Sequence, residues 1–294
     1  MYTGSSDPFT VDLDKESSPE FWSKNPETCI PEHINIVITE SERVREMYPK
    51  SKLNVSYGRT PMESYDIYFK DEENDKPIFI YLHGGYWQRL NKEVSAYCVS
   101  PLAEKGYRVI VMDYNLCPKV NLETVVSQVK EGVKHILKYA KITNAKELTL
   151  CGHSAGGHMF ASLLDSDIEN KDLIKHFVLI SGIYDLKEIW HTKALSDLSN
   201  TVNPLGLNDE TSIKLSPMYF KNFIKYDAEV HLLTGKYEAP SFFGQAKVFG
   251  DILKKQNYTV HLHEFPEYDH FDIVHSMKDV NSDITKYLFY ILKI

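Results

Sequence analysis

Short apolar runs that alternate with helix-period segments most constrain the fold of this 294-residue chain. The runs are rich in β-branched and aromatic residues, as strands are, and they occupy 64–69, 77–82, 107–112, 147–151, 176–181, 228–234 and 258–263. Helices are expected over 32–50, 91–104, 121–141, 154–165 and 271–293. Because strands that alternate with helices form βαβ units, we predict an α/β fold whose mostly parallel central sheet carries helices on both faces.

The length and this element pattern favour a single domain over residues 1–294. Proteins of this class and size are commonly one unit, and 43% of the residues are apolar, which allows a sizeable core. Segment 1–30 is rich in Pro, Ser and charge, and we expect an N-terminal arm on the surface or over a site entrance. Residues 184–227 lack clear periodicity and are long for a loop, so we expect an insertion or lid there.

The charges and the cysteines limit the partners and the compartment. The formal net charge is −8 and the charges are scattered, so we expect neither nucleic acid nor an anionic membrane as partner. No apolar stretch reaches membrane-spanning length, and the polar, acidic start does not resemble a signal peptide. The four cysteines form no CxxC pair, which favours free thiols in a reducing compartment. We therefore expect a cytoplasmic protein.

A strand, a glycine-rich turn and a helix follow one another around Ser154. After the run ELTLC come GHSAGG and then the helical segment HMFASLLDSD. A nucleophilic serine needs this order, because a sharp turn presents its hydroxyl at the end of the strand and leaves no room for side chains at Gly152 and Gly156. We predict that Ser154 is a nucleophile. The alternative is a tight glycine turn with an incidental serine.

A second glycine motif, HGGYW, directly follows the run PIFIYL. In enzymes with this nucleophile turn, one oxyanion N–H comes from the residue after the serine and another from a loop of this kind. We therefore expect backbone N–H groups of Gly84, Gly85 and Ala155 to form the oxyanion hole. His83 is expected to brace the loop rather than take part in the chemistry.

In enzymes with a nucleophile turn of this kind, the three catalytic residues occur along the chain in the order Ser, acid, His. The catalytic base is therefore expected in the loop between the last strand and the last helix. His270 occupies that loop, and we predict that it is the base. His261 and His263 lie within the strand, and His275 lies inside the helix. The pair at 261 and 263 has no third ligand at a sensible spacing, so we expect no metal site there.

The acid should follow the strand at 228–234, where Glu238 is the only carboxylate in the sequence GKYEAP. A glutamate can orient the imidazole and stabilise its charged form as an aspartate does. Asp269, next to the base in sequence, is the alternative, although neighbouring residues seldom aim their side chains at each other.

Together these motifs resemble the kynurenine formamidase (arylformamidase) family of the α/β-hydrolase fold. The most telling part is HGGYW, because esterases of the hormone-sensitive-lipase group usually carry a third glycine at the position of Tyr86. The resemblance covers roughly residues 50–290 and includes the turn GHSAGGH and the closing DHF. It departs at the acid, because the family usually has Asp where this chain has Glu238.

The resemblance implies hydrolysis of N-formyl-L-kynurenine to L-kynurenine and formate, in tryptophan breakdown, with no metal and no organic cofactor. Tyr86 and Trp87 would then bind the substrate, by narrowing the acyl side and offering an aromatic surface to its ring. A homodimer is a further expectation. A general carboxylesterase for small acyl esters would share every catalytic residue, and a binding module on an inactive hydrolase fold is the third alternative.

Overall fold

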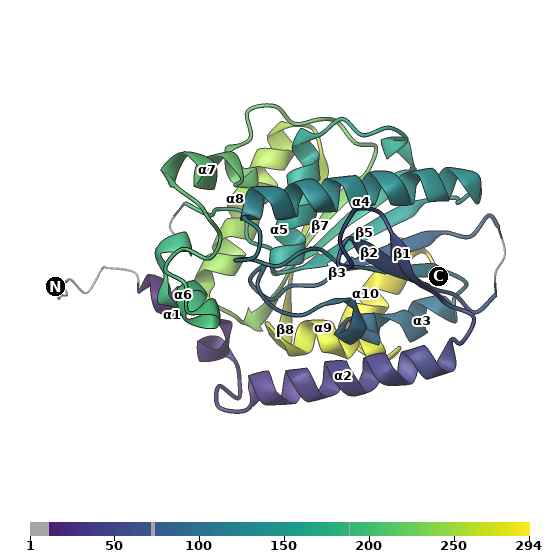
Figure 1. The fold of residues 1–294 in the computed structure, drawn as a ribbon, viewed down its shortest axis with the longest axis horizontal. Helices are drawn as coiled ribbons and strands as arrows, with labels where there is room; N and C mark the ends of the chain where they lie inside the picture. The colour runs from purple at the N-terminus through teal and green to yellow at the C-terminus, as the bar shows by residue number, and fades with distance from the viewer. Residues whose placement is uncertain (1–11, 72–73, 188) are drawn as a thin grey trace, which may run out of the picture.

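One eight-stranded sheet forms the centre of the computed structural model, which describes residues 12–71, 74–187 and 189–294 (Figure 1). The strands are β1 (Lys52–Ser56), β2 (Ser64–Tyr68), β3 (Ile78–Leu82), β4 (Arg108–Met112), β5 (Leu148–His153), β6 (Ile174–Ile180), β7 (Glu229–Tyr237) and β8 (Thr259–Asp269). Their order in the sheet is β1-β2-β4-β3-β5-β6-β7-β8. Neighbours from β4 to β8 are parallel, while β1 and β2 form an antiparallel edge. The predicted mostly parallel sheet is confirmed.

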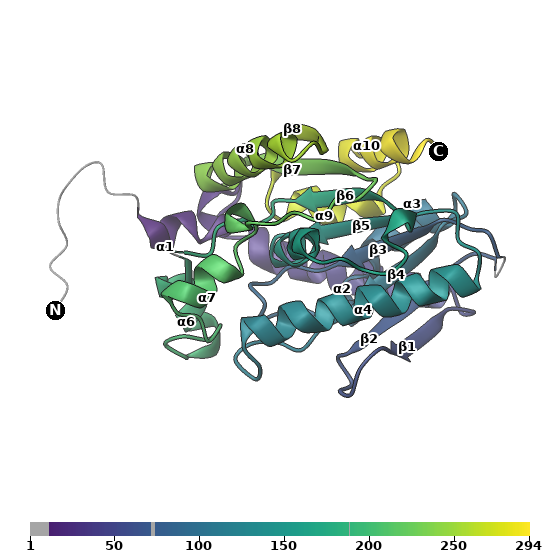
Figure 2. The same ribbon diagram turned by 90° about the horizontal axis from the view of Figure 1, so that it is seen from above.

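Helices cover both faces of this sheet (Figures 1 and 2). They are α1 (Leu13–Glu16), α2 (Cys29–Met47), α3 (Val99–Ala103), α4 (Leu122–Ile142), α5 (Ala155–Ala161), α6 (Lys193–Ser199), α7 (Asp209–Lys214), α8 (Pro240–Lys255), α9 (Asp272–His275) and α10 (Asp283–Leu292). Helices α4, α5 and α8 pack on one face, and α2, α3, α9 and α10 pack on the other. The α/β-hydrolase architecture follows from this arrangement.

The two faces of each central strand contribute to two separate hydrophobic clusters. In β3, Ile78, Ile80 and Leu82 face the cluster beneath α4 and α5, whereas Phe79 and Tyr81 face the cluster beneath α2 and α10. Side chains alternate between the faces of a strand, so a strand buried on both faces is apolar throughout. This is why the central strands appear in the sequence as continuous apolar runs.

Two of the expected helices are broken in the structure. Segment 91–104 consists of the 3-10 turns Lys92–Val94 and Ala96–Cys98 followed by α3, because Pro101 lacks the N–H that one continuous helix would need. Segment 271–293 is interrupted before α10, where the side chain of Ser282 accepts a hydrogen bond from the backbone N–H of Thr285 and caps a new helix. Both breaks follow from local side-chain chemistry within a helical pattern.

Outside the N-terminal arm and segment 184–227, one strand and one helix, β1 and α8, were not expected from the sequence. Strand β1 is short and largely exposed, so it carries no apolar run. Helix α8 begins at Pro240 and contains Gly244 and Gly250, and glycine weakens a helical pattern. Its buried side, which includes Phe249 and Leu253, packs against the sheet.

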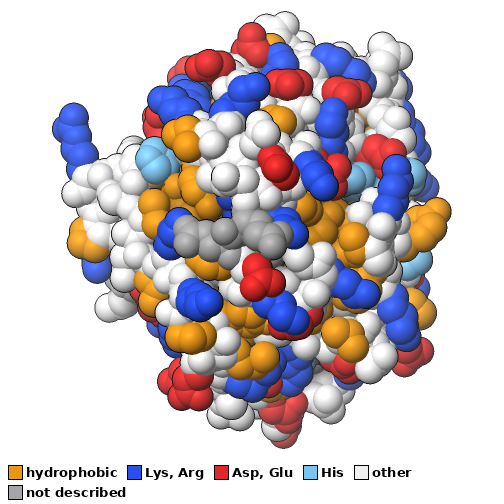
Figure 3. Space-filling model, turned by 90° about the vertical axis from the view of Figure 1, so that its right-hand side faces the viewer, with side chains coloured by type: hydrophobic (Ala, Val, Ile, Leu, Met, Phe, Trp, Pro, Cys, Tyr) orange, Lys and Arg blue, Asp and Glu red, His pale blue; other side chains and the backbone are white. Residues whose placement is uncertain are grey.

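The face at the amino ends of the parallel strands shows lysine, arginine and acidic side chains mixed together rather than a broad patch of one sign (Figure 3). All four cysteines are buried free thiols. Within the described ranges, no helix is long and apolar enough to cross a membrane.

The expected arm and insertion contain short helices near the carboxyl ends of the strands. Residues 1–11 lie outside the described residues, and α1 and a 3-10 turn at Pro19–Trp22 follow them. Segment 184–227 contains α6 and α7, which lie on the same side of the molecule as α1 (Figure 1). Both segments therefore lie at the end of the sheet where ligands bind in folds of this kind.

Candidate active site

Ser154 occupies the sharp turn between β5 and α5. Its backbone angles are φ 53° and ψ −115°, a conformation with positive φ that residues other than glycine seldom adopt. A Cβ atom on Gly156 would lie only 2.2 Å from the backbone oxygen of Leu82, so this position has no room for a side chain. The strained turn and the lack of room at Gly156 match the geometry that a nucleophile at Ser154 would need.

His270 and Glu238 form a buried pair beside this turn. Nδ1 of His270 lies 3.0 Å from Oε2 of Glu238, and the two side chains are only 5% and 2% exposed. Glu238 directly follows β7 and His270 directly follows β8, so the parallel pairing of these strands brings them together. The other carboxylate oxygen of Glu238 accepts hydrogen bonds from the hydroxyl of Ser181 at 2.5 Å and the N–H of Gly235 at 2.7 Å. The carboxylate is therefore held firmly in place.

Asp269, the alternative acid, points to other partners. Its carboxylate accepts hydrogen bonds from the hydroxyl of Ser23 at 2.5 Å and from the backbone N–H groups of Phe271 and Asp272 at 2.8 Å. Burial opposes ionisation, but these hydrogen bonds hold the pKa of Asp269 below its usual value. Asp269 thus fastens the N-terminal segment and the turn before α9.

The competing histidines lie elsewhere. His261 and His263 are exposed on β8, and Nε2 of His261 contacts a carboxylate oxygen of Glu229 at 3.0 Å. His275 lies in α9, where its Nδ1 is 3.2 Å from Nδ1 of His33. None of the three has Glu238 as a partner among the contacts of the described residues.

The loop that was expected to supply oxyanion N–H groups passes next to Ser154. A Cβ atom on Gly84 would lie 3.0 Å from Cβ of Ser154, and Gly85 adopts a φ of 95° that favours glycine. His83 braces the loop, since its Nδ1 is 2.9 Å from the carbonyl oxygen of Gly84 and its Nε2 is 3.2 Å from Oδ1 of Asp113. Ala155 begins α5 directly after the serine.

Tyr86 and Trp87 were both expected to bind the substrate, but they point in different directions. The hydroxyl of Tyr86 donates a hydrogen bond to the carbonyl oxygen of Ser17, and its side chain lines the cavity next to Ser154. Trp87 is completely buried in the core, where its indole N–H donates to Nδ1 of His158 at 3.2 Å. The expectation for Trp87 is therefore wrong, because adjacent residues in this loop face opposite sides.

A cavity of about 350 Å³ adjoins Ser154 and His270. Its remaining walls come from segments far apart in the sequence: the N-terminal segment, the start of α2, the HGGYW loop and the residues just after it, the end of β5, α6 and the residue before α9. The residues are Pro19, Glu20, Ile30, His33, Ile34, Gly85, Tyr86, Arg89, Leu90, His153, Leu198 and Phe271. The expected arm and insertion thus each contribute to the wall of the candidate site.

Sequence reasoning missed several of these residues. His153, the middle residue of the turn, lies with its ring centre 4.6 Å from that of His270, and its Nε2 has no hydrogen-bond partner within the described parts of the chain. Burial and the nearby His270 lower its pKa well below the usual value, so it remains neutral. Among the described residues that line the cavity, Glu20 and Arg89 carry the only side-chain charges besides histidines. His153 could have been found from its place in GHSAG, whereas the other two had no signal.

The sheet order and the turn at Ser154 define the protein as a hydrolase of the α/β-hydrolase fold. A solved structure of a candidate thioesterase from Silicibacter sp. tm1040 has this fold. It aligns with a TM-score of 0.78 at 23% sequence identity and covers 94% of this chain and 98% of that chain.

Sequence comparisons are more specific. Residues 65–214 match the family model named BD-FAE. Kynurenine formamidase from Drosophila melanogaster is 30% identical over 96% of this chain and 97% of its own length. Kynurenine formamidase from Salmo salar is 33% identical over 94% of each chain. The chain therefore belongs to the BD-FAE family and to the kynurenine formamidase family, as its motifs indicate.

Proposed function

We propose that this protein hydrolyses N-formyl-L-kynurenine to L-kynurenine and formate, with Ser154 as nucleophile, His270 as base and Glu238 as acid. The observation that carries the assignment is the buried pair of His270 and Glu238 beside the strained Ser154 turn. Membership of the kynurenine formamidase family supports the choice of substrate.

The mechanism follows from the roles that these positions allow. His270 accepts the proton of the Ser154 hydroxyl as its oxygen attacks the formyl carbon, and Glu238 stabilises the resulting imidazolium. Backbone N–H groups of Gly84, Gly85 and Ala155 stabilise the oxyanion. His270 then gives its proton to the departing aniline nitrogen. Water, deprotonated by the same imidazole, attacks the formyl ester and releases formate.

The acyl side of the cavity is proposed to be narrow because of Tyr86. Tyr86 lines both the cavity at Ser154 and a second one of about 180 Å³. The hydroxyl contact with Ser17 anchors the ring in that place. A formyl group carries only hydrogen on its carbonyl carbon and would fit, whereas each added carbon must displace packed atoms.

The amino-acid end of the substrate is proposed to pair with Arg89 and Glu20. A zwitterionic amino acid carries one carboxylate and one ammonium group, and these two side chains offer the complementary charges on the wall of the same cavity. Arg89 is held there because its Nη2 donates to the carbonyl oxygen of Leu198 at 2.6 Å.

The decisive experiment compares purified protein on N-formyl-L-kynurenine and on p-nitrophenyl acetate and butyrate. We expect kcat/KM to be far higher on the formyl substrate, and Ser154→Ala to remove both activities. A general carboxylesterase would instead prefer the esters. A catalytically inactive binding module would fail to turn over either substrate and would not react with a fluorophosphonate probe, which we expect to label Ser154 once per chain.

A cytoplasmic location and a homodimer are also proposed. The buried free cysteines are compatible with a reducing compartment. Fractionation of cells that express a tagged chain, and light scattering after size-exclusion chromatography, test these two points separately.

A further inference from the structure

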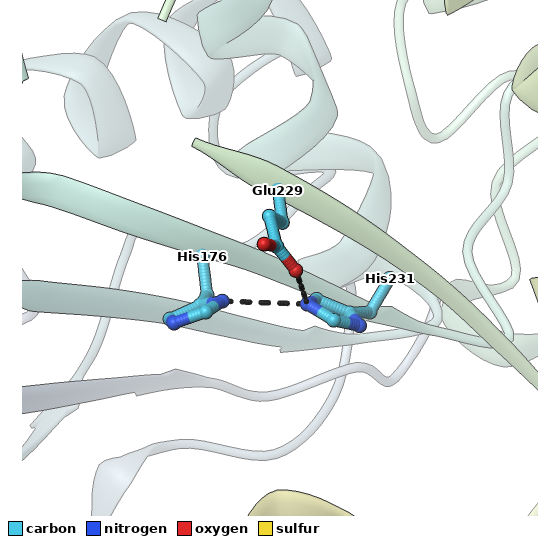
Figure 4. A group of neighbouring side chains, drawn as sticks. All are labelled: His176, Glu229 and His231. Atoms are coloured by element: carbon cyan, nitrogen blue, oxygen red, sulfur yellow. Dashed lines mark hydrogen bonds and ion pairs between the residues drawn. The ribbon is translucent and has the colours of Figure 1, made fainter. Parts of the chain in front are cut away.

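A group of potential metal ligands lies at the opposite end of the sheet from Ser154. His176 lies near the start of β6, and Glu229 and His231 lie at the start of β7 (Figure 4). The parallel register of these strands pairs His176 with Glu229 and Val178 with His231. Because Ser154 follows the carboxyl end of β5, the proposed catalytic residues take no part in this group.

The spacing of the ligand atoms suits a zinc-type ion. Nδ1 of His176 lies 3.3 Å from Nε2 of His231, and Oε2 of Glu229 lies 3.7 Å from the same Nε2. All three ligand atoms lie within 4.8 Å of one another. Two ligand atoms bound to one Zn²⁺ at about 2.0–2.1 Å in tetrahedral geometry are separated by about 3.3 Å. Small side-chain rotations would therefore bring all three to bonding distance.

The ring nitrogen of His231 that points away from the group, Nδ1, has a hydrogen-bond partner, as is usual for a histidine that binds a metal ion. Its Nδ1 contacts the hydroxyl of Tyr287 on α10 at 3.0 Å, which orients the ring and leaves Nε2 directed at His176 and Glu229. His231 is only 1% exposed, so its position is set by packing. His176 Nδ1 and His231 Nε2 face each other at hydrogen-bond distance, so at least one of them is unprotonated. Its lone pair becomes available to a metal ion when the ion displaces the proton that the two nitrogens share.

A fourth ligand is close by. Nε2 of His261 on β8 already contacts Oε2 of Glu229 at 3.0 Å, and its ring is stacked on that of His231 with centres 4.7 Å apart. A turn of the exposed His261 side chain, or a water molecule, would complete four-coordination.

Solvent and ions can reach the group. His176 and Glu229 line a cavity of about 380 Å³ whose other charged side chains are of both signs: Glu147, Lys175, Lys225, Asp227 and Lys293. Lys175 is neutralised by Asp227 at 2.8 Å, so its charge opposes a cation less than a free lysine would.

We propose that His176, Glu229 and His231 form a binding site for a divalent transition-metal ion of the zinc type. The imidazole and carboxylate ligands select such an ion over Mg²⁺ or Ca²⁺, which prefer all-oxygen sites. The ion would tie β6 to β7 and, through His261, to β8, so its role is to stabilise this end of the sheet.

The test uses the full chain, freed of metal with a chelator and dialysed. Zinc binding is measured by competition with a colorimetric zinc indicator, and melting temperature is measured with and without ZnCl₂. We expect one Zn²⁺ per chain and a rise in Tm of about 2–5 °C. His176→Asn and Glu229→Gln alter exposed or half-exposed residues, and each should weaken binding about tenfold or more and remove the Tm rise.

His263→Asn is the matched control, because it removes an exposed histidine of β8 that lies outside the group. It should leave the zinc affinity unchanged. Replacement of Zn²⁺ by Co²⁺ should produce the visible absorption of a four-coordinate ion in the parent and in the His263 variant. The proposal is overturned if the parent does not bind zinc, if both His176→Asn and Glu229→Gln bind it as the parent does, or if His263→Asn abolishes binding.

Discussion

At the level of single residues, Glu238 shows how a glutamate can occupy a position where the family usually has an aspartate. The hydroxyl of Ser181 and the backbone N–H of Gly235 hold one oxygen of Glu238, and the other oxygen meets the imidazole. Both carboxylate oxygens of the longer side chain are therefore held, and one of them is directed at the imidazole. Asp269 is occupied with Ser23 and the turn before α9, so the structure supports only one of the two carboxylates as partner of the base.

Ser154→Ala and His270→Ala should each lower kcat by about 10³-fold or more, because each removes a group that takes part in proton or acyl transfer. Steady-state kinetics on N-formyl-L-kynurenine measures the loss, and circular dichroism checks that the fold persists. His275→Ala is the control. If it were the more damaging histidine change, the base would have been misassigned.

Glu238→Gln should lower kcat about 10²–10⁴-fold with little change in KM, since the neutral amide cannot stabilise the imidazolium. Glu238→Asp keeps the charge and should retain more activity than Glu238→Gln. Asp269→Asn serves as the comparison and should mainly loosen the N-terminal segment. A larger loss of kcat in Asp269→Asn would move the acid to that residue.

Tyr86→Gly should reduce the preference for formyl over butyryl anilides about tenfold or more, because it removes a ring that lines both cavities and so makes room for a longer acyl chain. The backbone tolerates the change, since Tyr86 has a φ of 55°, which suits glycine. The measurement is kcat/KM for both anilides, corrected for their intrinsic reactivity. Tyr86→Phe, which removes only the hydroxyl, should keep the parent's preference; an equal preference in all three proteins would refute the role of the ring.

At the scale of elements, the site depends on how closely α5 approaches the sheet. The absence of a side chain at Gly156 lets the first turn of α5 touch the backbone after β3. This contact aligns the start of the helix with the HGGYW loop, and both are needed around one oxyanion. In α8, by contrast, Gly244 is exposed and a Cβ there would have nothing within 4 Å.

Two glycine substitutions should therefore have opposite effects on the free energy of unfolding. Gly156→Ala should lower it by about 2–3 kcal/mol and reduce activity, because Cβ would overlap the backbone oxygen of Leu82. Gly244→Ala should raise it by about 0.5–1 kcal/mol without changing activity, since alanine favours a helix. Urea denaturation measures both. An unchanged stability of Gly156→Ala would show that α5 can shift away from the sheet without cost.

At the scale of the whole molecule, the cavity is assembled from parts that are distant in the chain. Glu20 comes from the N-terminal segment, Arg89 from the loop after β3 and Leu198 from α6. Hydrogen bonds fasten the N-terminal segment to the body at several points, including Ser17 to Tyr86 and Ser23 to Asp269. Part of this segment, including Pro19 and Glu20, lines one side of the cavity.

Arg89→Ala and Glu20→Gln should each raise KM for N-formyl-L-kynurenine about tenfold while kcat changes little, because each removes binding that does not strengthen in the transition state. p-Nitrophenyl acetate lacks both charged groups, so its kinetics should stay as in the parent and serve as the control. A fall in kcat on both substrates would mean that these residues position the catalytic groups and do not bind the substrate.

Features that depend on local geometry could be predicted from the amino-acid sequence alone. A strand and a helix repeat every two and every 3.6 residues, so the central strands, α4 and the turn at Ser154 could be located from short windows of sequence. The same holds for the loop that carries His270, because the chain order of the fold places it after the last strand. Confirmation of the fold class rests on these local patterns.

Which side chains contact each other across the fold became clear from the three-dimensional structure. It placed Trp87 in the core and Tyr86 at the cavity, although the two are adjacent in the sequence. It brought His176 to His231 because they lie on neighbouring parallel strands, and Glu238 to His270 because they directly follow two such strands. Strand order and register arise from the packing of the whole sheet, so no short stretch of sequence contains them.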